Sequence, residues 1–242
     1  MAQVRLRKKT LAWDLGKERF AWLLRQRNIP FVDETKLKSR ITVQGTNPDF
    51  LGEPRGLPRF IAEVESLRAP GPLRKISSRS FVLNPNQILR RLRGPVKHAA
   101  KQLKPYATIN IPMIVVLDNA RRVGVPLSPI ELIQLLGEIE YRVPVNLATG
   151  QPAGPTTKHH GSGQVLTPTQ KRYISAIAVN RPKQGHQYVE PIEKERPMCL
   201  LILHNPYALV RLPRKIFNDS EDTHLGLRNG QWVNLRSGKR VL

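Results

Sequence analysis

Three carboxylates that could form one metal site lie in a short part of the chain, at Asp49, Glu63 and Glu65. Residues 48–52 and 58–66 are expected to form an antiparallel hairpin, because turn-forming residues separate two apolar runs. A hairpin that is symmetrical about this turn sets Asp49 opposite Glu63, with Cβ atoms about 5 Å apart. Glu65 then points to the same face as Glu63, because side chains alternate along a strand.

Carboxylates held this close repel one another, at roughly 1 kcal/mol for each pair in water and more when they are buried. They stay ionised together only beside a cation, and oxygen ligands suit Mg²⁺ or Mn²⁺. Such an ion can acidify an attacking water and neutralise charge on a scissile phosphate. The residue types therefore predict a hydrolytic site in which Asp49 and Glu63 bind metal and Glu65 is a ligand or a base.

The charge of the whole chain indicates a polyanionic partner. Forty Lys and Arg against eighteen Asp and Glu give a formal net charge of +22, which opposes compaction by self-repulsion. Nucleic acid is the usual reason for such an excess. The sequence has no apolar run of about 18 residues, and its basic residues are not confined to one amphipathic helix, so a membrane partner is not predicted.

The single cysteine, Cys199, can form neither an internal disulfide nor a zinc cluster. The basic N-terminus lacks the apolar core of a secretory signal. Both observations predict a cytoplasmic protein.

The hydrophobic pattern predicts a mixed α/β fold. Helices are expected over 14–27, 86–104 (interrupted at Gly94-Pro95) and 128–140; strands are expected over 40–44, 48–52, 58–66, 111–119, 173–180 and 198–205. Asn229-Gly230 predicts a hairpin in the C-terminal tail. Three regions follow: a core over 1–145, a flexible loop rich in Gly, Pro and Thr over 146–164, and additional strands over 165–242 that pack on the same domain.

Pro48-Asp49 followed by Glu63-x-Glu65 resembles the PD-(D/E)XK nuclease superfamily, and the segment from Gln102 to Tyr106 is similar to the QxxxY motif of its RecB-like members. The order of expected elements matches the family core over about residues 14–119. This resemblance implies a restriction-endonuclease-like mixed β-sheet flanked by helices, and Mg²⁺-dependent cleavage of DNA. It also implies that Gln102 orients the substrate or the nucleophile, and that Glu18 on the first helix completes the metal shell. The biological role that it implies is in bacterial defence or in mobile elements.

The family's lysine is replaced here by Glu65, as in some restriction endonucleases. Helical geometry argues against a substitute on the helix that carries Gln102, because its lysines project away from the buried stripe. The stripe comprises Val96, Ala99 and Leu103, and the lysines are Lys97, Lys101 and Lys104. Gln102 and Tyr106 flank the stripe, four residues apart, and can reach the edge of the site.

Nucleic-acid contacts are expected, more with DNA than with RNA, from Arg90, Arg91, Arg93, Lys97, Lys101, Tyr106, Arg121 and Arg122. If six to ten basic residues touch phosphates, binding weakens by about 10³–10⁵ between 50 and 200 mM salt. Two alternatives stay open: a catalytically inactive nucleic-acid-binding subunit on a degenerate nuclease fold, and a structural RNA-binding protein. Assembly as a homodimer or with a partner subunit also stays open.

Overall fold

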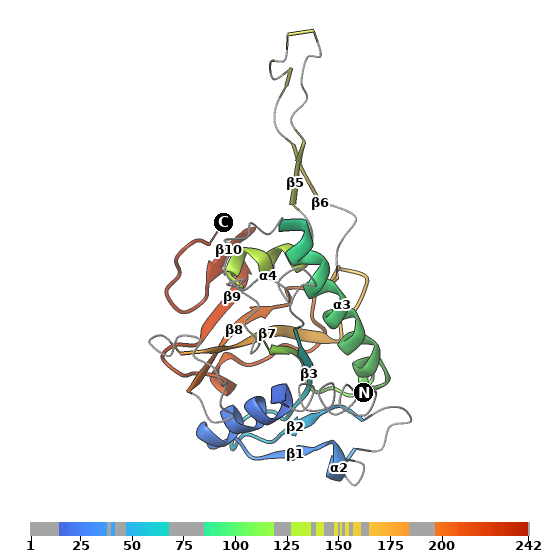
Figure 1. Ribbon diagram of the computed structural model, residues 1–242, viewed down its shortest axis with the longest axis vertical. Helices are drawn as coiled ribbons and strands as arrows, with labels where there is room; N and C mark the ends of the chain where they lie inside the picture. The colour runs from blue at the N-terminus through green and yellow to red at the C-terminus, as the bar shows by residue number, and fades with distance from the viewer. Residues whose placement is uncertain are drawn as a thin grey trace, which may run out of the picture.

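A mixed eight-stranded sheet forms the centre of the computed structural model (Figure 1). The structure describes residues 15–37, 40–41, 47–67, 85–118, 127–136, 139–142, 148–149, 151, 153–154, 157–160, 165–183 and 197–241. The strands, in their order across the sheet, are β1 (Phe31–Asp33), β2 (Phe50–Gly52), β3 (Phe60–Ser66), β4 (Met113–Asp118), β7 (Ile174–Pro182), β8 (Met198–His204), β9 (Thr223–Arg228) and β10 (Gln231–Asn234). The α/β class is therefore as predicted, and strands from both the 1–145 and 165–242 regions share one sheet.

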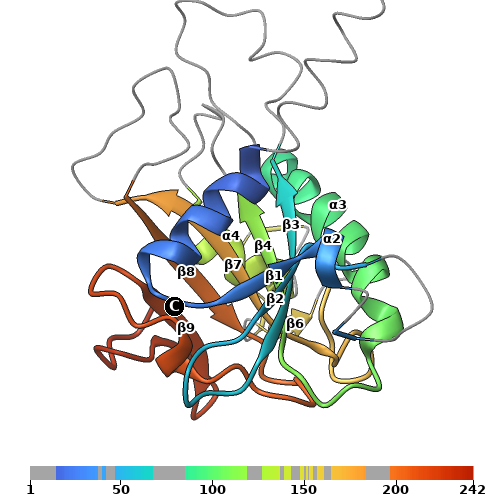
Figure 2. The same ribbon diagram turned by 90° about the horizontal axis from the view of Figure 1, so that it is seen from below.

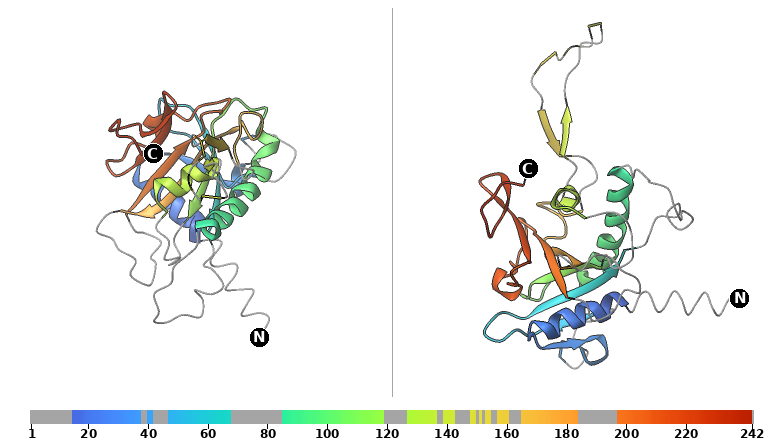
Figure 3. Two further views of the ribbon diagram at one scale, coloured as in Figure 1. Left: turned by 90° about the horizontal axis from the view of Figure 1, so that it is seen from above. Right: turned by 60° about the vertical axis from the view of Figure 1, so that its left-hand side comes forward.

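Helices cover both faces of this sheet (Figures 2 and 3). They are an N-terminal helix over 15–26, α2 (Glu34–Leu37), α3 (Pro85–Leu103) and α4 (Pro129–Leu136), with short 3₁₀ turns η2 (Lys104–Tyr106) and η3 (Arg214–Ile216). One apolar cluster joins α3 and α4 to strand residues such as Ile61 and Val115. The other joins Phe20 of the N-terminal helix to the alternate strand residues, such as Ala62. Among helices in the described part of the chain, none has the length and apolar character needed to cross a bilayer.

The elements that position the carboxylates follow the predicted order. β2 and β3 are antiparallel with Phe50 opposite Ala62, so Asp49 comes level with Glu63, and the predicted register is confirmed. β3 then connects through α3 to β4, which lies parallel to it. Because successive side chains alternate, Glu63 and Glu65 share the α3 face with Ile61, while their neighbours face the N-terminal helix.

The end of the N-terminal helix and the C-terminal hairpin lie close to where the sequence predicts them. The N-terminal helix ends at residue 26, and Asn28 just after it has a φ of 52°, in the left-handed region that Asn tolerates. The N–H of Ile29 then donates to the carbonyl of Leu24 at 2.9 Å, which closes the helix end. Asn229 and Gly230 also have positive φ, and the predicted hairpin joins β9 to β10.

Four predicted elements differ from the structure. α3 runs without interruption through Pro95, since its apolar stripe packs along the sheet and offsets one lost backbone hydrogen bond. The helix expected over 128–140 ends at Leu136, and 139–142 instead form β5 (Ile139–Arg142), paired with β6 (Thr157–His160) inside the expected loop. This two-stranded sheet projects from the body (Figure 1). Residues 40–41 do not form the strand expected over 40–44, and residues 42–46 lie outside the described residues. The segment just before them instead forms β1 and α2, which the sequence pattern did not predict.

Candidate active site

Asp49 and Glu63 form a buried carboxylate pair where β2 meets β3. Their side chains are 3% and 4% exposed. The backbone N–H of Asp49 donates to Glu63 Oε2 at 3.3 Å, and the N–H of Val64 donates to Asp49 Oδ2 at 2.7 Å. These bonds fix both carboxylates relative to the strands that carry them.

Lys17 of the N-terminal helix forms an ion pair with Asp49 of this pair. Its ammonium lies 2.5 Å from Asp49 Oδ1 and 2.9 Å from Glu34 Oε2 of α2. Burial alone lowers the pKa of Lys17, but the hydrogen bonds and charges of Asp49 and Glu34 outweigh it and raise that pKa. Lys17 therefore stays protonated at neutral pH and supplies a fixed positive charge beside Asp49.

Gln102 of α3 closes the site from the opposite face. With its amide nitrogen oriented toward the carboxylate, Gln102 donates to both oxygens of Glu63. The predicted reach of Gln102 to the site is thus confirmed. Tyr106, which was expected to contact nucleic acid, is fully buried in the core below α3, so the surface contact predicted for it is wrong. Burial is the main cause of the raised pKa of the Tyr106 hydroxyl, and the charge of Glu63 is the second cause. Tyr106 is therefore near Glu63, on the core side of the site.

Glu65 belongs to the same face but is engaged by a different partner. It is buried, at 4% exposed, and hydrogen bonds to Nδ1 of His98 on α3. The His98 side chain is half exposed. The buried Glu65 carboxylate therefore contacts a side chain that is open to solvent.

The two carboxylates at the centre resist ionisation together. Burial, followed by the charge of Asp49, raises the pKa of Glu63 to about 9. Burial also raises the pKa of Asp49, against the lowering effect of the Lys17 hydrogen bond. At neutral pH Glu63 therefore holds a proton unless a further cation approaches.

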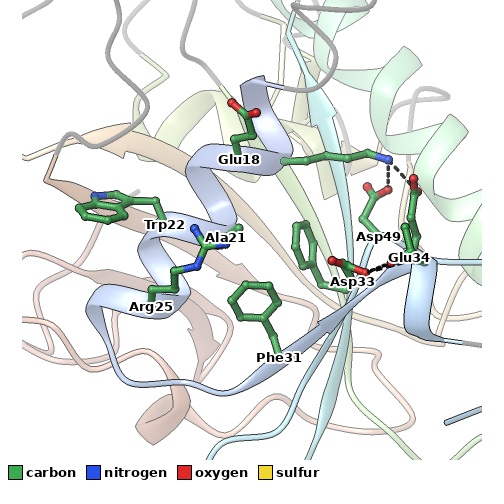
Figure 4. A pocket seen from close by; sticks show the side chains of 11 residues that line it. Glu18, Ala21, Trp22, Arg25, Phe31, Asp33, Glu34 and Asp49 are labelled. Carbon is green, nitrogen blue, oxygen red and sulfur yellow. Dashed lines mark hydrogen bonds and ion pairs between the residues drawn. The ribbon is translucent and has the colours of Figure 1, made fainter. Parts of the chain in front are cut away.

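Glu18 does not join this cluster, contrary to the resemblance. Figure 4 shows its carboxylate pointing away from Asp49. On a helix whose buried stripe includes Phe20, Leu23 and Leu24, residue 18 lies on the far side and residue 17 lies on the flank. Glu34, which the pattern did not single out, is the additional carboxylate near Asp49.

Two of the basic residues expected to bind nucleic acid lie on the exposed side of α3. Lys97 and Lys101 are exposed, and Arg93 is partly buried. The side chains of Arg90 and Arg91, and the whole of Arg121 and Arg122, lie outside the described residues. Lys171, just before β7, lies near α3: burial and then the charge of Lys97 lower its pKa.

A second buried ion pair anchors the N-terminal helix behind the site. Arg19 Nη1 donates to Asp118 Oδ2 at 2.8 Å, and Asn180 donates to Asp118 Oδ1 at 3.3 Å. Gly16 lies so close to the ends of β3 and β4 that an added Cβ would come within 2.5 Å of Ser66 Oγ. This contact brings Lys17 to Asp49.

Breaking the ion pair is expected to destabilise the fold. Arg19→Met leaves Asp118 buried without its cation, which costs about 3–5 kcal/mol of unfolding free energy. Urea denaturation measures this cost. The double variant Arg19→Met/Asp118→Leu is expected to recover most of the loss, because no buried charge remains. A single variant that unfolds at the wild-type urea concentration would contradict this role.

The site meets part of what a divalent metal requires. Among the described residues, no group of three or more His, Cys, Asp and Glu side chains is arranged to hold a metal ion. Mg²⁺, however, is commonly held by one or two carboxylates, with water and substrate phosphates completing its shell. Asp49 and Glu63 fit that smaller requirement, because they form a desolvated acidic pair that already draws in an ammonium group.

No family model, curated protein or solved structure matches the chain.

Proposed function

We propose that the protein is a Mg²⁺- or Mn²⁺-dependent nuclease that hydrolyses phosphodiester bonds in DNA. The observation that carries the proposal is the convergence of Asp49, Glu63, Lys17 and Gln102 at one point of a chain with a net charge of +22. An acidic site in so basic a molecule suits a substrate that is anionic and a reaction that needs a cation.

The element order supports a restriction-endonuclease-like core within the α/β fold. A helix, the antiparallel strands β2 and β3, a crossover helix and a parallel strand follow one another in the order that the resemblance implies, with β1 and α2 as additional elements before β2. Lys17 is proposed to take the role of the family's lysine, whose position in the motif is occupied here by Glu65. It arrives from the N-terminal helix and not from α3, where the other candidate lysines face solvent.

Each residue has a distinct proposed task. Asp49 and Glu63 would hold the divalent ion, which when bound supplies a Lewis acid for water and phosphate. Lys17, permanently charged, would neutralise negative charge that develops on the scissile phosphate. Gln102 would hold the Glu63 carboxylate in place, and Glu65 would orient His98 as a proton carrier open to solvent.

Plasmid nicking tests the proposal. Wild-type protein is expected to nick supercoiled DNA with Mg²⁺ or Mn²⁺ and to stop when EDTA is added. Asp49→Asn is expected to lose at least about 100-fold in rate, the usual scale for removal of one electrostatic element of a catalytic site. Glu53→Gln changes a partly exposed turn carboxylate, which forms an ion pair with the exposed Arg59, and serves as the matched control. Equal nicking by wild type and Asp49→Asn would overturn the assignment.

A second candidate is a nucleic-acid-binding protein without catalysis. The lack of a three-ligand metal group among the described residues favours it. Salt-sensitive DNA binding with no cleavage by wild-type protein, under either metal, would select this candidate.

A further inference from the structure

A cavity of about 400 Å³ opens beside Asp49, between the N-terminal helix and the β1–α2 segment (Figure 4). Lys17, Asp49 and Glu34 form the part of its wall that belongs to the carboxylate cluster. The remaining wall has an aromatic and apolar part, with Trp22 and Ala21 from the helix and Phe31 and Phe50 from the strands, and a polar part made by Glu18, Arg25, Asp33 and Thr35. The cavity thus joins a planar, apolar wall to the proposed reaction centre.

The aromatic wall is ordered and partly cationic. Phe31 and Phe50 meet edge to face with ring centroids 5.5 Å apart, and Phe50 is almost fully buried. The guanidinium of Arg25 lies over the Phe31 ring, 5.6 Å from its centroid. Aromatic rings and Arg guanidinium planes are the surfaces on which proteins stack single bases.

Polar groups at the wall can recognise the edge of a base. The indole Nε1 of Trp22 is buried and finds no hydrogen-bond acceptor among the described residues. Asp33 is exposed on the opposite side, and Thr35 donates to its carboxylate, which lowers the pKa of Asp33. The exposed carboxylate of Asp33 therefore offers an ionised acceptor at the wall, which suits the amino group of a nucleobase.

We infer that this cavity takes one unstacked nucleobase of the bound strand, next to the phosphate at Asp49. The inference rests on the proposed function, since it needs a nucleic-acid strand across the site. A phosphate group does not suit a wall made of aromatic rings with Asp33 and Glu34 beside them. The volume lies at the small end of ligand pockets, at about 300–1,000 Å³, which fits a base and not a large cofactor. Because a paired base cannot enter, substrates with an unpaired nucleotide at the cleavage point are preferred.

An abasic scan tests the inference. Single-stranded 12-nucleotide DNAs, each lacking one base, are bound to wild-type protein in EDTA, so that no cutting occurs. Loss of the captured base is expected to weaken binding by about 5- to 100-fold at one position, the range for one stacked base. Trp22→Ala is expected to weaken binding of the intact strand similarly, and then to be insensitive to the abasic site at that position.

Two further variants keep the result interpretable. Arg25→Ala alters an exposed residue, so it leaves folding intact while removing part of the stacking surface. Trp232→Ala removes an indole on β10, outside the cavity wall, and is expected to keep the position-specific loss. If wild type nicks plasmid but loses the same affinity at every abasic position, the base pocket is wrong and the nuclease proposal stands. If wild type neither binds these strands nor nicks plasmid, both proposals fail.

Discussion

Lys17→Met is expected to slow DNA cleavage by about 100- to 1,000-fold, while leaving DNA affinity within a few fold of wild type. Lys17 is one of 40 basic residues, so its loss changes the general attraction for DNA very little. Its ammonium is nevertheless fixed 2.5 Å from Asp49, where the phosphate charge would develop. Lys17→Met is therefore expected to lower the rate of the chemical step, which is measured by single-turnover cleavage at saturating protein.

Lys36→Met is the matched control for this substitution, because Lys36 is an exposed lysine on the nearby helix α2. It is expected to cleave at close to the wild-type rate. Lys17→Arg keeps the charge with a different shape and is expected to retain intermediate activity. Full activity in Lys17→Met would show that the ammonium only neutralises Asp49 in the resting protein.

Glu63→Gln is expected to remove a strong pH dependence from the stability of the metal-free fold. The folded pKa of Glu63 is about 9, against an ordinary value of 4.5, so folding takes up a proton between these values. Its stabilising contribution is complete below pH 4.5 and falls by about 1.4 kcal/mol per pH unit until the folded pKa is passed. The variant has no such proton to lose, and it is expected to be the more stable protein at pH 8 to 9.

Chemical denaturation at several pH values, in EDTA, measures this difference. Glu53→Gln, at a partly exposed carboxylate outside the site, is expected to keep the wild-type slope. Adding Mn²⁺ to wild-type protein is expected to flatten the slope, because a cation favours ionised Glu63. Parallel curves for wild type and Glu63→Gln would show that Glu63 ionises freely in the fold.

The sequence predicts the strand half of the site better than the helix half. Hairpin symmetry was enough to bring Asp49 level with Glu63, because register in a short hairpin follows from the turn. Gln102 was placed correctly from helical periodicity, since the buried stripe of α3 fixes its rotation. Both inferences use interactions that are local or nearly local in the chain.

Lys17 and Glu34 were missed for a different reason. Their approach to Asp49 depends on how the N-terminal helix and α2 pack on the sheet, and hairpin symmetry carries no information about that packing. The stripe of Gly16, Phe20, Leu23 and Leu24 holds a usable signal: it turns residue 17, and not Glu18, toward the sheet edge. The start of β5 was likewise mispredicted as helix, because its pairing with β6 overrides the helix preference of the local sequence.

A crystal soaked with Mn²⁺ tests the central claim most directly. We expect an anomalous density peak between the carboxylates of Asp49 and Glu63, with the Lys17 ammonium displaced from its contact with Asp49. The same soak of Asp49→Asn crystals is expected to leave that position empty. An intact Lys17–Asp49 ion pair with no peak in the wild-type crystal, at Mn²⁺ concentrations that support cleavage by metal-dependent nucleases, would contradict the account.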